Sequence, residues 1–179
     1  MLAKETFAFS LYLRSAPHGF LTYFYQPVEY LFICQLYAAQ FHERHAVRVL
    51  WLSAFLYSLY AIVLGVWAWR EGVLSEEPTA LLITEWVLII TLLLYYFYTL
   101  YRSKEMLEVT RQPVFWISIG NFLFYCGTFF LMGLYAEIQK FDPLLAKNLF
   151  FINTFLNLLL YTFWSIGFLC LRKPHRIFT

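Results

Sequence analysis

Charged side chains are scarce in this chain: Asp, Glu, Lys and Arg make up 13% of its 179 residues, against 61% hydrophobic and 22% aromatic residues. In soluble globular proteins about a quarter of the residues are charged. The shortage excludes a water-soluble globule, because too few polar side chains are present to cover the surface of a folded chain of this length. The formal net charge of +2 creates no strong field, so we expect no nucleic-acid partner.

Cysteine, lysine and histidine are few, and their positions exclude several chemistries. The three cysteines, Cys34, Cys126 and Cys170, lie in apolar segments, and an odd number of such thiols does not indicate a disulfide framework. The apolar core of the long segments contains no lysine, which excludes a retinal Schiff base. A buried haem would lack its axial ligands, because all the histidines lie outside those cores: His18, His42, His45 and His175.

Signatures of catalysis and of metal binding are missing from the sequence as well. No His-Glu-x-x-His, Gly-x-Ser-x-Gly or phosphate-loop pattern occurs in it. His42 and His45 lie in one basic loop, but no third ligand follows at a useful spacing. The loop at 102–112 is too short to form a soluble domain. We therefore expect no enzymatic activity, no metal and no cofactor.

Long apolar segments fill most of the chain, at about 20–40, 49–70, 79–101, 113–137 and 145–171. A helix rises about 1.5 Å per residue, so roughly 20 apolar residues cross a hydrocarbon core of about 30 Å. These segments predict an all-α fold: a polytopic transmembrane helical bundle that forms a single domain over 1–179. The lipid bilayer is then the main partner of its surface.

Residues 2–13 predict a shorter helical piece before the first span. A piece of this length covers only about 18 Å, less than a bilayer core. It is either an interfacial helix or the end of a helix that a longer homologue would complete. We favour the second interpretation, because the piece has to run from the cytoplasmic to the outer side to meet the next span. The run is too short and too aromatic for a signal peptide.

Positive side chains predict the orientation, because cytoplasmic loops carry an excess of Lys and Arg. The loops at about 40–48 and 102–112, together with the C-terminal tail, hold more Lys and Arg than the loops of the opposite side. One of those opposite loops also carries Glu76 and Glu77. We therefore expect the C-terminus in the cytoplasm and the Glu76-Glu77-Pro78 turn outside.

Three features of the sequence are specific enough to compare with other proteins. They are the run Tyr23-Phe24-Tyr25-Gln26-Pro27-Val28-Glu29-Tyr30, Glu85 early in its span, and the run Pro113-Val114-Phe115-Trp116-Ile117-Ser118-Ile119-Gly120. Together they resemble an uncharacterised group of bacterial membrane proteins with about seven helices, over most of Leu2–Leu171. The resemblance implies a helical bundle in the bacterial cytoplasmic (inner) membrane and carries no activity. Compared with that group, this chain is shorter at its N-terminus.

Two carboxyl groups, those of Glu29 and Glu85, lie inside predicted spans. An ionised carboxylate at membrane depth is costly unless it is paired, hydrated or protonated, so such a residue is a functional candidate. Both spans begin on the predicted outer side, which places the carboxyl groups in one leaflet, where they could face one cavity. Pro27 frees a backbone carbonyl near Glu29, and Tyr25 adds a hydroxyl. The alternative is a hydrogen-bonded or protonated carboxyl without a function.

Asparagines extend the candidate polar interior. Asn153 and Asn157 are four residues apart and share one helix face. Asn121 lies in the preceding span. We expect these amides to line a ligand-binding or proton-binding site together with the two carboxyl groups. The alternative is that they only join neighbouring helices through hydrogen bonds, which contribute about 1 kcal/mol or less each.

Glycines mark the 113–137 segment as a helix that packs closely. Gly120 and Gly127 are seven residues apart, and Gly133 follows them. Small residues on one face allow membrane helices to approach each other. We therefore expect this helix to be central in the bundle.

The sequence leaves three functions open. The first is a small ligand-binding or sensory bundle that uses an outer-leaflet carboxylate pocket and acts through a protein partner in the membrane, because the chain has no cytoplasmic output domain. The second is a structural or accessory subunit of a larger membrane complex, with aromatic faces that bind neighbouring helices or lipid. The third is a small transporter coupled to protons or cations.

Overall fold

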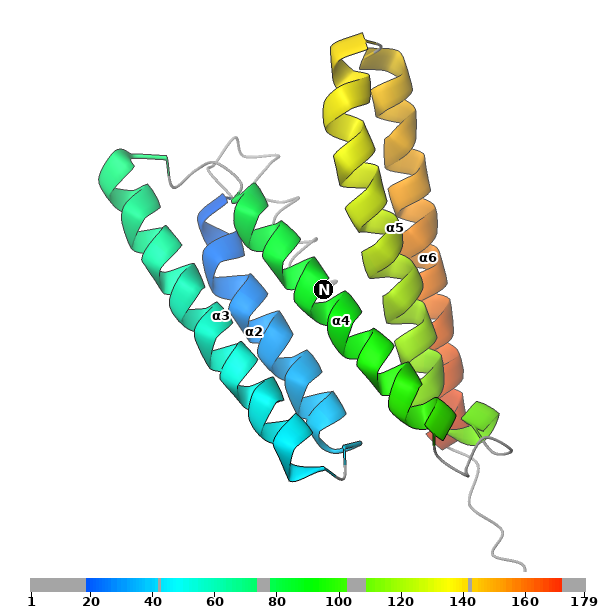
Figure 1. The fold of residues 1–179 in the computed structure, drawn as a ribbon. Coiled ribbons are helices and arrows are strands. Elements are labelled where there is room, and N and C mark those ends of the chain that lie inside the picture. The colour runs from blue at the N-terminus through cyan, green and yellow to red at the C-terminus, as the bar shows by residue number, and fades with distance from the viewer. Residues whose placement is uncertain (1–18, 42, 74–77, 103–108, 142, 172–179) are drawn as a thin grey trace, which may run out of the picture. The chain divides into compact units, whose positions relative to one another are not determined.

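The prediction of an all-α fold is confirmed by the structure, a computed structural model that describes residues 19–41, 43–73, 78–102, 109–141 and 143–171. These residues contain no strand. Their helices follow the predicted segments in order (Figure 1): α2 (Gly19–Ala38), α3 (Arg44–Glu71), α4 (Thr79–Arg102), α5 (Pro113–Phe141) and α6 (Pro143–Leu171). The predicted helical piece at 2–13 lies outside the described residues.

Four of these helices are long and apolar enough to cross a membrane: α3, α4, the Pro113–Gly133 part of α5 and the Phe151–Cys170 part of α6. The chain is therefore a membrane protein. The remaining predicted span is helical, as α2, but it is not among the four. Its 20 residues include the polar Thr22, Gln26 and Glu29, which lower its hydropathy.

Proline and glycine set several helix ends. Pro113 and Pro143 are the first residues of α5 and α6, where the missing N–H costs nothing because the first helical N–H groups have no partner in the helix. At the other end of α3, Gly72 has a φ of 73°, a left-handed conformation that glycine adopts without strain. The Val73 N–H then donates to the Ala68 carbonyl at 3.0 Å and closes the helix.

Contacts divide the chain into two compact units, Met1–Val87 and Leu88–Thr179. The first unit contains α2, α3 and the beginning of α4. The second contains the rest of α4 with α5 and α6. Within the first unit α2 and α3 lie side by side (Figure 1), and the same holds for α5 and α6 in the second.

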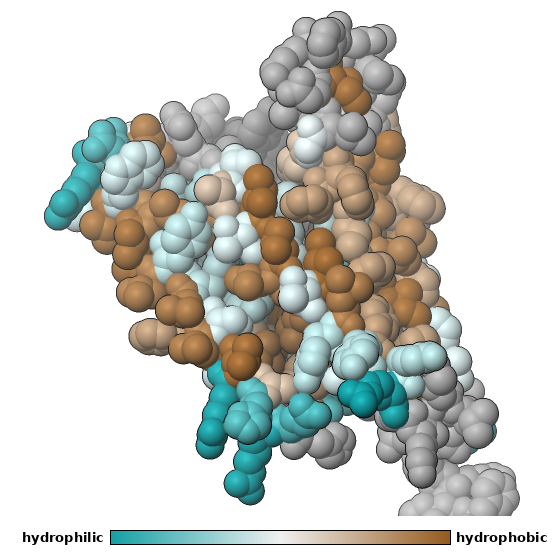
Figure 2. Space-filling view, in the orientation of Figure 1, coloured by the Kyte–Doolittle hydropathy of each residue, from teal (hydrophilic) through white to brown (hydrophobic). Residues whose placement is uncertain are grey.

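Small side chains bring α3 close to its neighbours in the first unit. Ala54, Ala61 and Ala68 are spaced by seven residues and are fully buried, so they form one stripe along the helix. Tyr57 lies in the same stripe, and its ring meets the ring of Tyr30 edge to face at 5.2 Å. The opposite face of α3 is apolar and exposed, and Figure 2 shows hydrophilic side chains gathered at the ends of this helix.

Glycines bring α5 and α6 together in the second unit. A Cβ added at Gly120 would lie 2.8 Å from the Phe163 Cβ, and one added at Gly167 would lie 2.9 Å from the Pro113 carbonyl oxygen. Both distances are under 3.0 Å, shorter than a Cβ approaches a carbon or an oxygen atom of a neighbouring helix, so a side chain at either position requires the helices to shift. The contacts run in opposite directions along the two helices, which makes this pair an antiparallel hairpin.

Gly133 differs from the expected small face. Among the residues whose side chains the structure describes, none lies within 4 Å of a Cβ added at Gly133, whereas Gly127 faces Leu156. The reason is helical geometry. Six residues at about 100° each rotate Gly133 by about 240° from Gly127, so the two glycines lie on different sides of α5. Two of the three glycines singled out in the sequence, Gly120 and Gly127, therefore pack against α6. A further glycine, Gly167 of α6, packs against α5.

Candidate functional site

Glu85 is the most deeply buried acidic residue of the described chain. It lies in the second turn of α4 and is 1% exposed, and both of its carboxyl oxygens are buried. The neighbouring Trp86 is 7% exposed. The local sequence places this carboxyl group in an apolar environment, since Leu81 and Ile89 flank it one turn away on either side and are also fully buried.

Tyr57 links α3 to the turn of α4 that carries Glu85. Its hydroxyl donates to the Leu81 carbonyl oxygen at 3.3 Å. In an α-helix this carbonyl also accepts the N–H of the residue four positions later, which is Glu85. Two donors therefore converge on one backbone oxygen, and the position of Tyr57 on α3 is tied to the backbone at Glu85.

A second tyrosine links α2 to α3. The Ser53 hydroxyl donates its single hydrogen to the Leu50 carbonyl at 2.7 Å. It therefore acts as the acceptor in its 2.9 Å contact with the Tyr30 hydroxyl, and Tyr30 is the donor. With the Tyr57 bond to α4, these contacts connect all three helical segments of the first unit.

Electrostatic interactions extend from these tyrosines to the two carboxyl groups predicted as site residues. Tyr57 interacts with Glu85 and with Glu29, and Tyr30 interacts with Glu85. Glu29 is half-buried on α2. Tyr25, four residues earlier on the same face, is also half-buried. The candidate site of the first unit thus consists of two carboxyl groups and the tyrosine hydroxyls between the helices.

The sequence did not single out Tyr30, Ser53 and Tyr57 for this site. Tyrosines in membrane helices commonly act as interfacial anchors. That interpretation gives no reason to assign a tyrosine in the middle of a span to a site. A usable signal was present in the spacing of seven between Ala54 and Ala61, because Tyr57 falls inside this small-residue stripe. A large side chain in such a stripe is expected to fill the space between helices.

The three predicted asparagines belong to the second unit. Asn121 on α5 is 2% exposed, and its Oδ1 accepts a hydrogen bond from the Trp164 Nε1 of α6 at 3.0 Å. The Asn157 Nδ2 donates to the Asn153 carbonyl at 3.1 Å, within α6. Asn121 therefore joins two helices, as the packing alternative expects, whereas the side chain of Asn157 bonds its own helix. The predicted lining shared with Glu29 and Glu85 stays a prediction, because those residues belong to the first unit.

Several polar atoms of the α5–α6 hairpin are buried without a hydrogen-bond partner among the described residues. They are the Asn121 Nδ2, the Thr128 Oγ1, the Asn153 Oδ1 and the Asn157 Oδ1. An unpaired polar atom in an apolar environment costs about 1–3 kcal/mol. Water is the simplest partner for such atoms, since amides and hydroxyls are the groups that buried water bonds.

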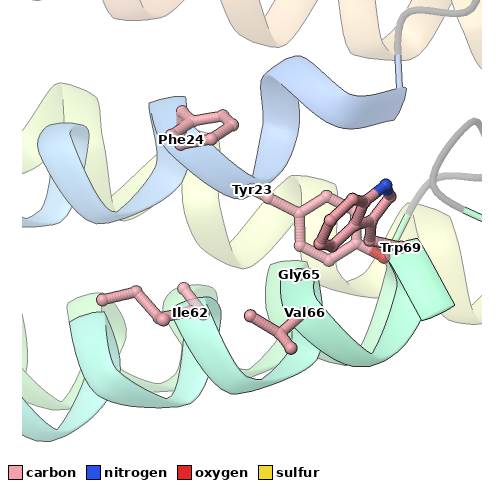
Figure 3. A pocket seen from close by; sticks show the side chains of 7 residues that line it. Tyr23, Phe24, Ile62, Gly65, Val66 and Trp69 are labelled. Atoms are coloured by element: carbon pink, nitrogen blue, oxygen red, sulfur yellow. The ribbon is translucent and has the colours of Figure 1, made fainter.

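A groove between α2 and α3 is separate from all the predicted site residues. It has a volume of about 380 Å³, and its lining is apolar and aromatic: Tyr23, Phe24, Ala61, Ile62, Gly65, Val66 and Trp69. Figure 3 shows the Tyr23 side chain of α2 reaching across Gly65 toward Trp69. Among the described residues, no three His, Cys, Asp or Glu side chains come together to hold a metal ion.

Comparisons with known proteins add no function to this geometry. No protein-family model matches the chain, and neither a curated protein nor a solved structure is similar to it. The resemblance to bacterial seven-helix membrane proteins stays a prediction.

Proposed function

We propose that this chain is a multi-pass sensor of the bacterial inner membrane that binds a proton or a small cation at Glu85 and Glu29 and acts through a membrane partner. The observation that carries the proposal is the burial of Glu85, which is 1% exposed within a helix apolar enough to cross a membrane. An ionised carboxylate in such a place is costly. Binding of a proton or a cation therefore has a large effect on the free energy of the surrounding helices.

The tyrosines connect this binding to helix packing. A change of charge at Glu85 acts on Tyr57, which bonds the Leu81 carbonyl one turn before Glu85. It also acts on Tyr30, which joins α2 to α3 through Ser53. Loss or gain of the charge on Glu85 thus alters the contacts of all three helical segments of the first unit. A partner protein in contact with α2 or α3 responds to that change in helix packing.

Infrared difference spectroscopy tests the proposal. The purified protein is taken through a pH jump in lipid vesicles, and the carbonyl band of protonated carboxylic acids is followed. We expect a band in the unsubstituted protein that disappears in Glu85→Gln, because the amide keeps the shape and removes the titration. Glu71→Gln is the matched control, since Glu71 is exposed at the end of α3. A band unchanged in both Glu85→Gln and Glu29→Gln would contradict the proposal.

A second candidate, an accessory subunit of a larger complex, rests on the outer face of α6. Phe151, Phe155 and Leu158 follow at helical spacing and are 70%, 56% and 63% exposed. Native electrophoresis of the chain solubilised from its own membrane in mild detergent separates the two candidates. A stable larger complex that is released by Phe155→Ala with Leu158→Ala, but not by Val63→Ala on α3, would favour the accessory subunit.

A further inference from the structure

The groove between α2 and α3 lies in one leaflet of the membrane. Its lining on α3 runs from Ala61 to Trp69, and the helix ends at Glu71. Ile62 is nine residues from that end, which is about 14 Å along the helix axis and roughly half of a 30 Å hydrocarbon core. A groove of this length is shorter than the depth of one leaflet, and its lining reaches Trp69, two residues before the end of α3.

The residues of the groove suit a hydrocarbon chain. The aliphatic and aromatic side chains of Ile62, Val66 and Phe24 are 63%, 46% and 74% exposed, so they meet whatever surrounds α3 in the bilayer. Gly65 lines the groove beside Tyr23, and a Cβ added at Gly65 would be in ordinary contact with the Tyr23 ring at 3.6 Å. Tyr23 and Trp69 have amphipathic rings, which are favoured near the headgroups.

A positive charge lies beside the Trp69 end of the groove, at Arg70. Arg70 is exposed and does not line the groove, but it follows the lining residue Val66 by four residues, which places it at the margin of the groove's side of α3, one turn closer to the helix end. Its long side chain can reach the headgroup region while its stem stays on apolar surface. Glu71 is four residues after Trp67, which does not line the groove, and so lies on another side of the helix. A cation beside the groove, one residue after its last lining residue Trp69, is therefore within reach of a phosphate above the apolar lining.

We propose that this groove is a binding site for one anionic glycerophospholipid, with an acyl chain between α2 and α3 and the phosphate at Arg70. The arginine guanidinium and a phosphate form a bidentate, charge-assisted pair. The site is independent of the carboxyl groups of the proposed sensor. It gives the first unit a lipid preference that a plain apolar surface lacks.

Native mass spectrometry of the purified chain in detergent measures this binding. Phosphatidylglycerol and phosphatidylcholine with identical acyl chains are titrated separately. We expect one tightly bound phosphatidylglycerol and a weaker phosphatidylcholine. Val66→Trp should weaken phosphatidylglycerol binding at least tenfold, because the indole fills the groove. Val63→Trp is the matched control: Val63 is 58% exposed on α3 but does not line the groove.

Arg70→Gln tests the charge and should make the affinities for phosphatidylglycerol and phosphatidylcholine equal. Arg48→Gln, at the other end of α3, is the control. Gly65→Leu provides a second way to fill the groove if Val66→Trp does not fold. Equal binding by Val66→Trp, Gly65→Leu and Val63→Trp would overturn the site. A preference for phosphatidylglycerol that survives Arg70→Gln would overturn the headgroup assignment, and equal binding of both lipids by the unsubstituted chain would overturn the anionic ligand.

Discussion

Tyr57 and Tyr60 lie three residues apart on α3, but their hydroxyls have different surroundings. Tyr57 is 2% exposed and donates to the Leu81 carbonyl of α4, whereas Tyr60 is 36% exposed. Because a hydrogen bond in an apolar environment has no water to replace it, single hydroxyl groups between helices contribute to stability in a way that those facing the surroundings do not.

We expect Tyr57→Phe to lower the free energy of unfolding by about 0.5–1.5 kcal/mol. The value should fall at the low end of this range, because the Leu81 carbonyl keeps its helical hydrogen bond. Thermal unfolding in detergent micelles measures the change. Tyr60→Phe serves as the control and should leave stability unchanged. Equal losses in the two variants would mean that the hydroxyl bond to Leu81 has no specific role.

The Trp164–Asn121 bond is a second test at the residue scale. Trp164→Phe removes the donor and leaves the Asn121 Oδ1, part of a residue that is 2% exposed, without its 3.0 Å partner. We expect a loss of about 1–3 kcal/mol. Trp116→Phe is the comparison, since the Trp116 Nε1 donates to the Thr110 carbonyl in an exposed bond that water can replace. Unfolding in one detergent at a fixed concentration should show the larger loss of unfolding free energy for Trp164→Phe. The reverse order would contradict this account.

At the scale of elements, the distance between α5 and α6 depends on glycine. Gly120 and Gly167 face rigid atoms of the partner helix, whereas Gly127 faces the methyl groups of Leu156, which can move. Gly133 has no described side chain within 4 Å of an added Cβ. The same substitution to alanine therefore has different consequences along one hairpin, and the difference follows from the register of the two helices.

We expect Gly120→Ala and Gly167→Ala each to destabilise the hairpin by about 1–3 kcal/mol, the usual cost of an overpacked core. Gly127→Ala should cost less, and Gly133→Ala should be neutral or slightly stabilising, because alanine is the better helix former. Chemical denaturation followed by circular dichroism in micelles would rank the four variants. A ranking in which Gly133→Ala loses as much as Gly120→Ala would contradict the close approach of the helices.

At the scale of the whole molecule, the loop charges set the orientation in the membrane. We expect a reporter fused after Thr179 to be active in the cytoplasm and one inserted at Glu76 to be active outside, because Lys and Arg are more frequent in the loops of the C-terminal side. Alkaline phosphatase, which is active outside, and a fluorescent protein, which is active inside, form a complementary pair of reporters. A C-terminal fusion that is active outside would reverse the proposed orientation.

The sequence alone determined the fold class and the order of the helices, whereas α3 begins five residues before the predicted segment at 49–70 and α5 ends four residues after the predicted segment at 113–137. Apolar length predicted where helices cross a membrane, and Pro113 and Gly72 mark helix ends through their own backbone restrictions. These properties are local, since they depend on side-chain hydropathy and on φ, and neighbouring helices hardly alter them. The deep burial of Glu85 also agrees with its position inside an apolar segment.

The tertiary structure decided which face of each helix is internal. In water an apolar stripe identifies the buried face of a helix, but in lipid both faces are apolar, so Val63 and Leu50 look alike in sequence although one is exposed and the other buried. The partners of Tyr57 and Gly120 depend on the rotation and register of two helices, which no local pattern contains. A carboxyl group inside an apolar segment is visible in the sequence, so Glu29 and Glu85 could be named as candidates, whereas the tyrosines around them and the groove at Gly65 required the fold.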